Sequence, residues 1–309
     1  LLEEEIIKTL KENHSTALLS ILTQLFNYSN DTDEIFEKAF PLLMEMLCNS
    51  DPESLLLILP AFTALCRWSS ECIKNEFQNI LHIMQNIIST TNTNYDIVKH
   101  EAVESLSTLA HADPVQFDPV VPAFTEYLIE GMKSDDDSLV CSCLNSFGII
   151  LDSNTQSVQQ YVEQIIPILY ELVKKDKTAD LIKFCETNQP DDDDFDNEAS
   201  NIFVNQDSLE IAGGAFLVLS SIMEKFPQIL NNCIQDIYYA STILSNSAVI
   251  QSNTNLCHGL NFIAGAMKSI SYNNSEMIQK FIIGLLKIIE QSKSENSICL
   301  ALESISYFI

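Results

Sequence analysis

The sequence predicts an all-α fold, an α-α superhelix (solenoid) of about seven two-helix repeats, and three observations support this class. Apolar residues recur with the 3.6-residue period of a helix along almost every segment, whereas the alternation of strands is nearly absent. One helical pattern that contains a proline also recurs along the chain. Finally, the 7 Gly and 9 Pro are too few for a fibrous or disordered chain, so the 309 residues should be mostly folded.

The first helix of each repeat is expected where an apolar pair is followed by a proline and two further apolar pairs. This pattern occurs as "AFPLLMEML" (39–47), "VVPAFTEYL" (120–128) and "IIPILYELV" (165–173). An aspartate that could cap a second helix follows each of them, after an interruption in the last case: Asp51, Asp135 and Asp207. Two helices in each repeat is the simplest account of this order.

The second helices set the length of the repeat. We expect them to begin near His14, Asp51, Asn94, Asp135, Asp207, Ile250 and Ser294. Neighbouring starts are 37 to 44 residues apart, except for the step of 72 residues that ends at Asp207. The common spacing is close to the roughly 40–47 residues of HEAT and armadillo repeats. We therefore expect residues 1–309 to be a single HEAT-repeat array, interrupted by an acidic insertion at 176–206 between the two helices of one repeat.

One second helix shows how its residues should divide between core and surface. Over 94–112, an apolar stripe with the spacing i, i+4, i+8 and i+11 begins at Val98 and predicts the face that packs inward. Glu101, Glu104 and Thr108 fall outside this stripe, so we expect them to point elsewhere.

The charge of the chain excludes some classes of partner. Asp and Glu (43) outnumber Lys and Arg (16), and a formal net charge of -27 repels phosphate backbones, so direct nucleic-acid binding is not expected. A field of this sign favours basic proteins as partners. The simpler alternative is that the charge keeps a large protein in solution. Apolar runs fall well short of the roughly 20 residues that cross a bilayer, so no membrane insertion is expected.

The chain carries no recognisable catalytic or metal-binding pattern. Its nine cysteines form no CxxC pair and have no histidine at zinc-ligand spacing, which predicts free thiols in a reducing compartment. The five histidines are scattered along the chain, and no phosphate-binding loop or serine elbow is present. We therefore expect a protein that is not an enzyme and needs no cofactor or metal.

The order of the helices and the acidic loop along the chain resembles that of a known protein family. "YVEQIIPILYELV" (161–173) is followed by the acidic loop and then by "QDSLEIAGGAFLVLSSIMEKFPQIL" (206–230). This order, with helices that contain a proline and helices that begin at an aspartate, resembles the importin-β (karyopherin-β) nuclear transport receptors over residues 111–245. The chain departs from the repeat pattern where Val-Arg often follows the capping Asp, since Leu139-Val140 and Leu209-Glu210 stand there. Family members are several times longer, so the chain would be a fragment.

The resemblance implies a receptor that shuttles between cytoplasm and nucleus. It implies an inner, concave wall of second helices that binds basic cargo and Ran-GTP in a mutually exclusive way. It also implies an outer wall of first helices that accepts the Phe-Gly repeats of nuclear pore proteins (nucleoporins).

Two sets of acidic residues are candidate contacts for basic partners. The first is the loop "DDDDFDNE", which concentrates six carboxylates in eight residues: Asp191, Asp192, Asp193, Asp194, Asp196 and Glu198. It is either a solvated insertion or a multivalent target for lysine clusters. The second set could line the concave face: Glu101, Glu104, Asp135, Asp136, Asp137 and Glu210. Ordinary solvent-facing positions, and helix capping by at least one of the three consecutive aspartates, are the alternatives for this set.

Two functions remain open from the sequence. The first is a nuclear transport receptor that binds basic cargo and Ran-GTP on an acidic concave surface for protein import. The alternative is a HEAT-repeat scaffold of a stable cytosolic complex, such as a phosphatase or ubiquitin-ligase regulator. A scaffold would keep its partners whatever nucleotide is present.

Overall fold

The computed structural model describes residues 9, 16–28, 33–67, 71–90, 96–174, 206–229, 254–292 and 294–309. Helices make up the regular structure of these residues, and no strand occurs among them. Backbone contacts divide the chain into two compact units, Leu1–Gln159 and Gln160–Ile309. That both units belong to one array stays a prediction. None of the helices described is both long and apolar enough to cross a bilayer.

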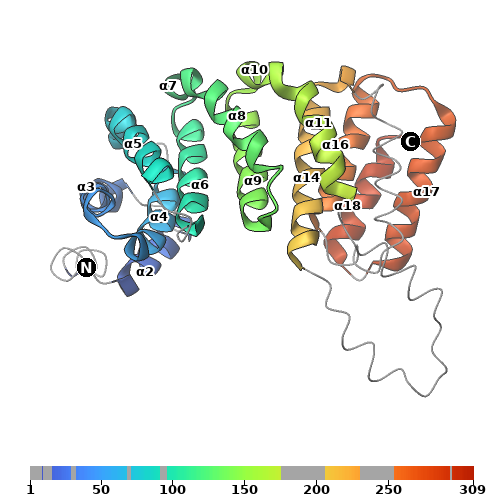
Figure 1. Cartoon of the computed structure of the whole chain (residues 1–309). Helices are drawn as coiled ribbons and strands as arrows, with labels where there is room; N and C mark the ends of the chain where they lie inside the picture. The colour runs from blue at the N-terminus through green and yellow to red at the C-terminus, as the bar shows by residue number, and fades with distance from the viewer. Residues whose placement is uncertain are drawn as a thin grey trace. The chain divides into compact units, whose positions relative to one another are not determined.

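The first unit consists of two layers of helices (Figure 1). One layer contains the second helices, each packed against the next: α2 (Thr16–Tyr28), α4 (Pro52–Cys66), α6 (Asp96–Ala112) and α9 (Asp137–Ser153). The other contains the first helices, which pack on α4, α6 and α9 in turn: α3 (Asp33–Asn49), α5 (Glu71–Thr90) and α8 (Val121–Gly131). Short helical turns complete the unit: α7 (Pro114–Phe117), η2 (Asp118–Val120) and α10 (Thr155–Val158).

The second unit repeats this arrangement. Its helices are α11 (Val162–Lys174), α14 (Gln206–Lys225), α16 (Thr254–Ser269), α17 (Ser275–Gln291) and α18 (Glu295–Ser306). The turns η3 (Gln159–Tyr161) and η5 (Pro227–Ile229) precede α11 and follow α14. In this unit α14, α16 and α18 pack side by side in chain order, while α11 packs on α14 and α17 packs on α18.

The repeat predicted from the sequence is confirmed. All seven second helices begin within four residues of their expected starts. Asp51 caps α4 as expected, since its Oδ1 accepts a hydrogen bond from the backbone N–H of Ser54 at 3.1 Å. The expectation for Asp135 is wrong, because the cap of α9 is the next residue, Asp136. Asp207 lies inside the first turn of α14, which begins at Gln206, rather than in front of that helix.

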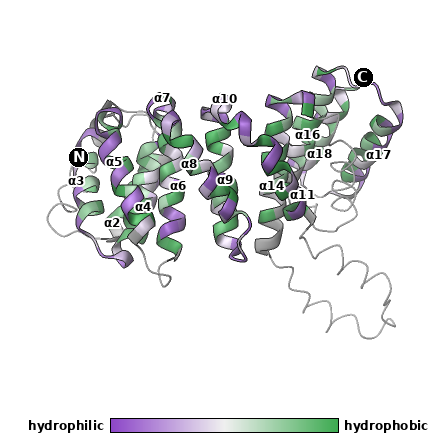
Figure 2. Cartoon of the chain, turned by 45° about the horizontal axis from the view of Figure 1, so that its top comes forward, coloured by the Kyte–Doolittle hydropathy of each residue, from purple (hydrophilic) through white to green (hydrophobic). Residues whose placement is uncertain are grey.

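The apolar faces of the helices meet between the two layers (Figure 2). The stripe that begins at Val98 is buried as predicted. Aromatic rings connect first helices of neighbouring repeats, because Phe117 contacts Phe77 edge to face at 6.4 Å and Phe124 at 5.8 Å between ring centroids. Such pairs stabilise a fold beyond the area that they bury. The core of the unit is therefore continuous from one repeat to the next.

Thr108 was expected outside the core, and this expectation is wrong. Its side chain is buried, and its Oγ1 donates to the backbone carbonyl of Ser105 at 2.7 Å. Ser105 Oγ in turn lies 2.6 Å from Thr63 Oγ1 of α4. A hydroxyl that bonds to a carbonyl of its own preceding turn can be buried without an unsatisfied group. The seam between α4 and α6 therefore includes polar side chains that hydrophobic periodicity does not detect.

Ser271→Gly should raise the free energy of unfolding of the second unit by about 0.5–1 kcal/mol. Ser271 has a φ of 51°, in the left-handed region that favours glycine. It ends α16 in a Schellman motif, in which Tyr272 N–H donates to Met267 O at 2.9 Å and Ser271 N–H donates to Lys268 O at 3.0 Å. Urea denaturation measures the change. Ser269→Gly, inside the helix, is the control and should lower stability; a loss in both variants would show that Ser271 is not strained.

Candidate functional site

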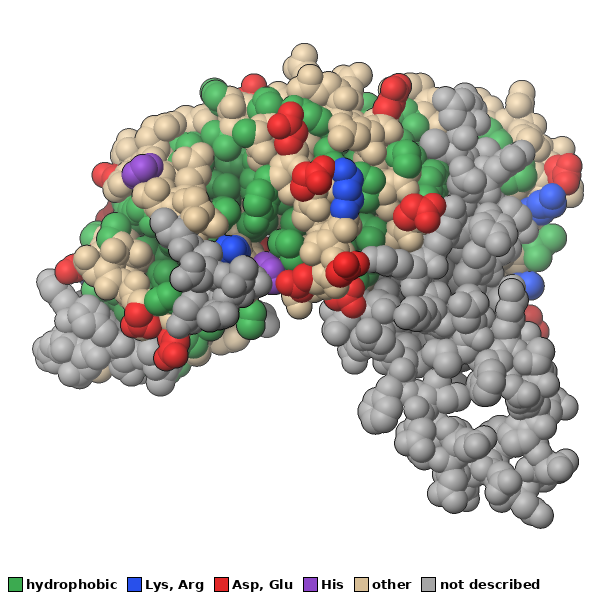
Figure 3. Space-filling model, viewed as in Figure 1, with side chains coloured by type: hydrophobic (Ala, Val, Ile, Leu, Met, Phe, Trp, Pro, Cys, Tyr) green, Lys and Arg blue, Asp and Glu red, His purple; other side chains and the backbone are tan. Residues whose placement is uncertain are grey.

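The candidate site lies on the side of α4, α6 and α9 that the first helices leave uncovered, which we call the second-helix face. Glu101 and Glu104 of α6 are half-buried, and both fall outside the stripe that begins at Val98. Acidic side chains outnumber Lys and Arg on the molecular surface in view (Figure 3). This face therefore presents carboxylates from a helix held on both flanks by its neighbours.

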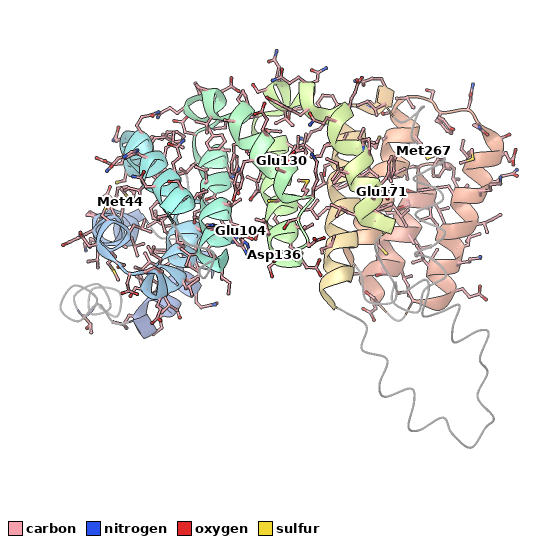
Figure 4. All side chains as sticks on the ribbon, viewed as in Figure 1. Met44, Glu104, Glu130, Asp136, Glu171 and Met267 are labelled. Carbon is pink, nitrogen blue, oxygen red and sulfur yellow. The ribbon has the colours of Figure 1, made fainter. Side chains whose placement is uncertain are left out.

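Two contacts between α6 and α9 fix the acidic residues in place. Ser142 of α9 donates a hydrogen bond from Oγ to Oε1 of Glu104 at 3.1 Å. His100 of α6, which is buried, has its Nε2 at 3.4 Å from Oδ2 of Asp136, at the start of α9. Figure 4 shows Glu104 and Asp136 on these two neighbouring helices. The structure thus brings together two of the predicted carboxylates through partners on the adjacent helix.

The three consecutive aspartates before and within α9 have different environments. Asp136 is the cap, and its Oδ1 accepts from the backbone N–H groups of Ser138 at 3.0 Å and Leu139 at 3.3 Å. Asp135 is exposed, whereas Asp137 is half-buried in the first turn of α9. Capping therefore accounts for Asp136 alone. The charges of the other two are stabilised by the positive end of the helix dipole and stay near the surface.

The carboxyl of Glu101 has a perturbed pKa. Burial raises its pKa above the usual glutamate range, and the nearby charge of Glu104 raises it further. Two carboxylates are thus held close together on one helix in a partly desolvated position. Perturbed groups of this kind cluster at functional sites.

Glu101→Gln should raise the free energy of unfolding at neutral pH by about 0.2–0.5 kcal/mol, the size of a like-charge pair on a helix. Because the pKa of Glu101 is raised in the folded state, its ionisation disfavours folding above that pKa. This penalty disappears as pH falls below the pKa of the unfolded chain, where both states are protonated. The gain should therefore vanish in acid, as denaturation at neutral and acid pH would measure. Glu126→Gln, on the exposed side of α8, is the control; a gain that persists in acid would contradict this account.

The remaining predicted residues are not among the side chains that the structure describes. The acidic loop Asp191, Asp192, Asp193, Asp194, Asp196 and Glu198 lies outside the described residues, as does most of 176–206. Glu210 falls within α14 of the second unit, but its side chain is likewise not among those described. Their role as partner contacts stays a prediction.

Sequence reasoning missed His100 and Ser142. Both stand in helices whose periodicity was read correctly, but their partners come from a different repeat. Polar side chains one repeat apart also pair elsewhere, since Ser304 Oγ donates to Asn261 Oδ1 at 3.3 Å. Polar residues spaced by one repeat length are the sequence feature that could have predicted these contacts.

The cysteines of the described segments are free thiols, in agreement with the prediction for those residues: Cys48, Cys66, Cys72, Cys141, Cys143, Cys257 and Cys299. Burial raises the pKa of Cys66 and raises that of Cys143 to about 12, so these two thiols are poor nucleophiles at neutral pH. Within the segments that the structure describes, no group of three His, Cys, Asp or Glu side chains could hold a metal ion. The carboxylates of the second-helix face suit the electrostatic recognition of a basic partner.

Comparison with known proteins gives a family match for the middle of the chain. Residues 49–185 match the family described as importin subunit beta-1-like, TPR repeats. A search of curated proteins finds no match. The family match confirms the resemblance to importin-β that the sequence indicated.

Solved structures extend the likeness to almost the whole chain. Yeast importin-beta (Kap95p) matches with a TM-score of 0.64 and 14% identity, over 99% of this chain and 41% of that one. A Kap95:Nup1 complex gives 0.63 and 14%, over 99% and 41%. A structure in which Kap95p binding switches the loops of RanGDP to the GTP-bound conformation gives 0.53 and 13%, again over 99% and 41%. At these identities the matches establish the solenoid fold, and the chain spans about two fifths of the length of those proteins.

Proposed function

We propose that this chain, a HEAT-repeat array of the importin-β type, is part of a nuclear transport receptor that binds basic cargo and Ran-GTP in a mutually exclusive way. The observation that carries the proposal is the pair Glu101 and Glu104, held half-buried on the second-helix face. Solved structures of the same fold supply further support, since they include Kap95 in complex with Nup1 and Kap95p bound to RanGDP.

The physical basis is relief of repulsion. Without a partner, the charge of Glu104 acts on the partly desolvated carboxyl of Glu101 and raises its pKa. A lysine or arginine placed between them would favour the ionised form of both carboxyls. The net charge of -27 would steer basic proteins towards this face. Cargo and Ran-GTP would then compete for the same carboxylates.

Other parts of the chain take their roles in the proposal from the importin-β likeness. The six carboxylates of 191–198 would add contacts to the same basic partners by multivalency. First helices would accept Phe-Gly nucleoporins, and Val115 in the adjoining turn α7 has an exposed apolar side chain that could add to such a contact. The protein would shuttle between cytoplasm and nucleus and would carry its cargo without covalent chemistry.

The double variant Glu101→Gln/Glu104→Gln tests the proposal. We expect it to lose about 1–3 kcal/mol of affinity for a lysine-rich cargo peptide and for Ran-GTP at low ionic strength, with a shallower salt dependence than the wild type. Fluorescence anisotropy at two salt concentrations measures both quantities. Glu126→Gln/Glu130→Gln removes the same charge from the first helix α8 and is the matched control. Affinities and salt slopes equal to wild type for both ligands would overturn the proposal.

A further inference from the structure

A cavity separate from the second-helix face lies in the first unit, between α2, α3 and α4, at the blue end of the chain in Figure 1. Its volume is about 280 Å³. The apolar part of its lining comes from three buried side chains, Leu19, Met46 and Ile58, one from each of the three helices. Neither Glu101 nor Glu104 lines it.

Polar and acidic residues form the remainder of the lining. Glu45 and Asn49 come from the last turns of α3, and Asp51 from the turn that leads into α4. Ser54 holds the Asp51 carboxylate in place, because its backbone N–H donates to Oδ1 at 3.1 Å and its Oγ donates to Oδ2 at 2.9 Å. These hydrogen bonds, the backbone one first, lower the pKa of Asp51 and keep it ionised. The cavity thus combines an apolar wall with two exposed carboxylates.

We propose that this cavity binds one lysine or arginine side chain of a basic protein partner, with the aliphatic stem on Leu19, Met46 and Ile58 and the cationic head between Glu45 and Asp51. Long cationic side chains bury their methylene stems while the charged end stays near water. The inference rests on the proposed function for the nature of the partner and adds a second anchoring point to it.

Size and ligand count favour this occupant over others. Sites for whole small-molecule ligands typically measure about 300–1,000 Å³, so this cavity suits a side chain better than a cofactor. Calcium requires roughly six to eight oxygen ligands. The described residues of the cavity offer two carboxylates and no group of three metal-ligating side chains. An organic cation with an apolar stem matches both parts of the lining.

The test uses the double variant Glu45→Gln/Asp51→Asn and a fluorescein-labelled oligolysine peptide as the probe. Asparagine caps helices as well as aspartate does, so α4 should be retained. We expect binding to weaken roughly 3- to 10-fold at low salt, as for the loss of two partly exposed ion pairs. Glu37→Gln/Glu53→Gln, on the same two helices but outside the cavity, removes the same charge and should change affinity by less than about twofold.

A second variant fills the site without removing its carboxylates. Asn49→Lys, at the end of α3, places a tethered ammonium at the cavity and should weaken oligolysine binding, whereas Asn75→Lys on α5 adds the same charge elsewhere and is its control. Equal losses of oligolysine affinity in the cavity variants and their controls would overturn the inference. They would show that the peptide responds to the overall negative charge of the protein. If Glu101→Gln/Glu104→Gln weakens binding and the cavity variants do not, the proposed function stands and this inference fails. If only the cavity variants weaken binding, this inference stands and the proposed role of Glu101 and Glu104 fails.

Discussion

Asn154→Asp should lower the free energy of unfolding of the first unit by about 3 kcal/mol, the largest loss that we expect from a single isosteric change. Asn154 is buried between α9 and α10, and its Nδ2 donates to the backbone carbonyl of Pro114 at 2.8 Å and to Oδ1 of Asp118 at 3.3 Å. An aspartate has no donor for these acceptors and adds a negative charge beside Asp118. Loss of the bonds and burial of an unpaired charge act in the same direction.

The control for this variant lies on the helix that precedes it. Asn145→Asp, on the exposed side of α9, introduces the same charge and should change stability by less than about 0.5 kcal/mol. Urea denaturation of both variants at neutral pH measures the difference. In acid, where the new carboxyl is protonated, the difference in free energy of unfolding between the two variants should become smaller. Equal stabilities of the two variants at neutral pH would show that the hydrogen bonds from Asn154 to Pro114 and Asp118 do not stabilise the first unit.

Gly259→Ala should lower the free energy of unfolding of the second unit by about 1–3 kcal/mol, because it overpacks the contact between α14 and α16. A Cβ at this position would overlap the ring of Phe216 and would lie 3.3 Å from the backbone carbonyl oxygen of that residue. Phe216 is fully buried, so its ring has no open space into which to move. The backbone of α14 would have to shift instead.

A second glycine of the same helix gives the opposite expectation. A Cβ at Gly265 would meet no atom within 4 Å. Gly265→Ala should therefore raise stability by up to about 1 kcal/mol through helix propensity alone. Thermal denaturation of the two variants should show shifts of opposite sign. A gain in both would mean that α14 and α16 approach less closely at Gly259 than the structure indicates.

Much of the fold follows from local pattern. The stripe that begins at Val98 and the starts of the second helices were read from periodicity and from capping residues, which depend only on neighbours in sequence. The single-residue difference between Asp135 and Asp136 at the start of α9 shows the limit of such reading. Either aspartate could cap, and the backbone conformation of the turn decides which one does.

The site could be predicted only in part, because its geometry depends on the register between repeats. Acidic sequence indicated Glu101 and Glu104, but the bond from Ser142 to Glu104 joins residues 38 apart. Thr63 and Ser105, 42 apart, form a similar link between α4 and α6. Such contacts can be predicted only when the packing of the two helices against each other is known, and the local sequence pattern does not give this. The half-buried state of Glu101 is a consequence of that placement.

The competition between cargo and Ran tests the central claim most directly. The full-length protein would be immobilised with a basic cargo bound and then exposed to GTP-locked Ran, with GDP-bound Ran as the control. A transport receptor of the importin-β type is expected to release its cargo to GTP-locked Ran and to retain it with the GDP-bound form. Retention of the partner whichever nucleotide is present would contradict the account and would indicate a HEAT-repeat scaffold of a stable complex.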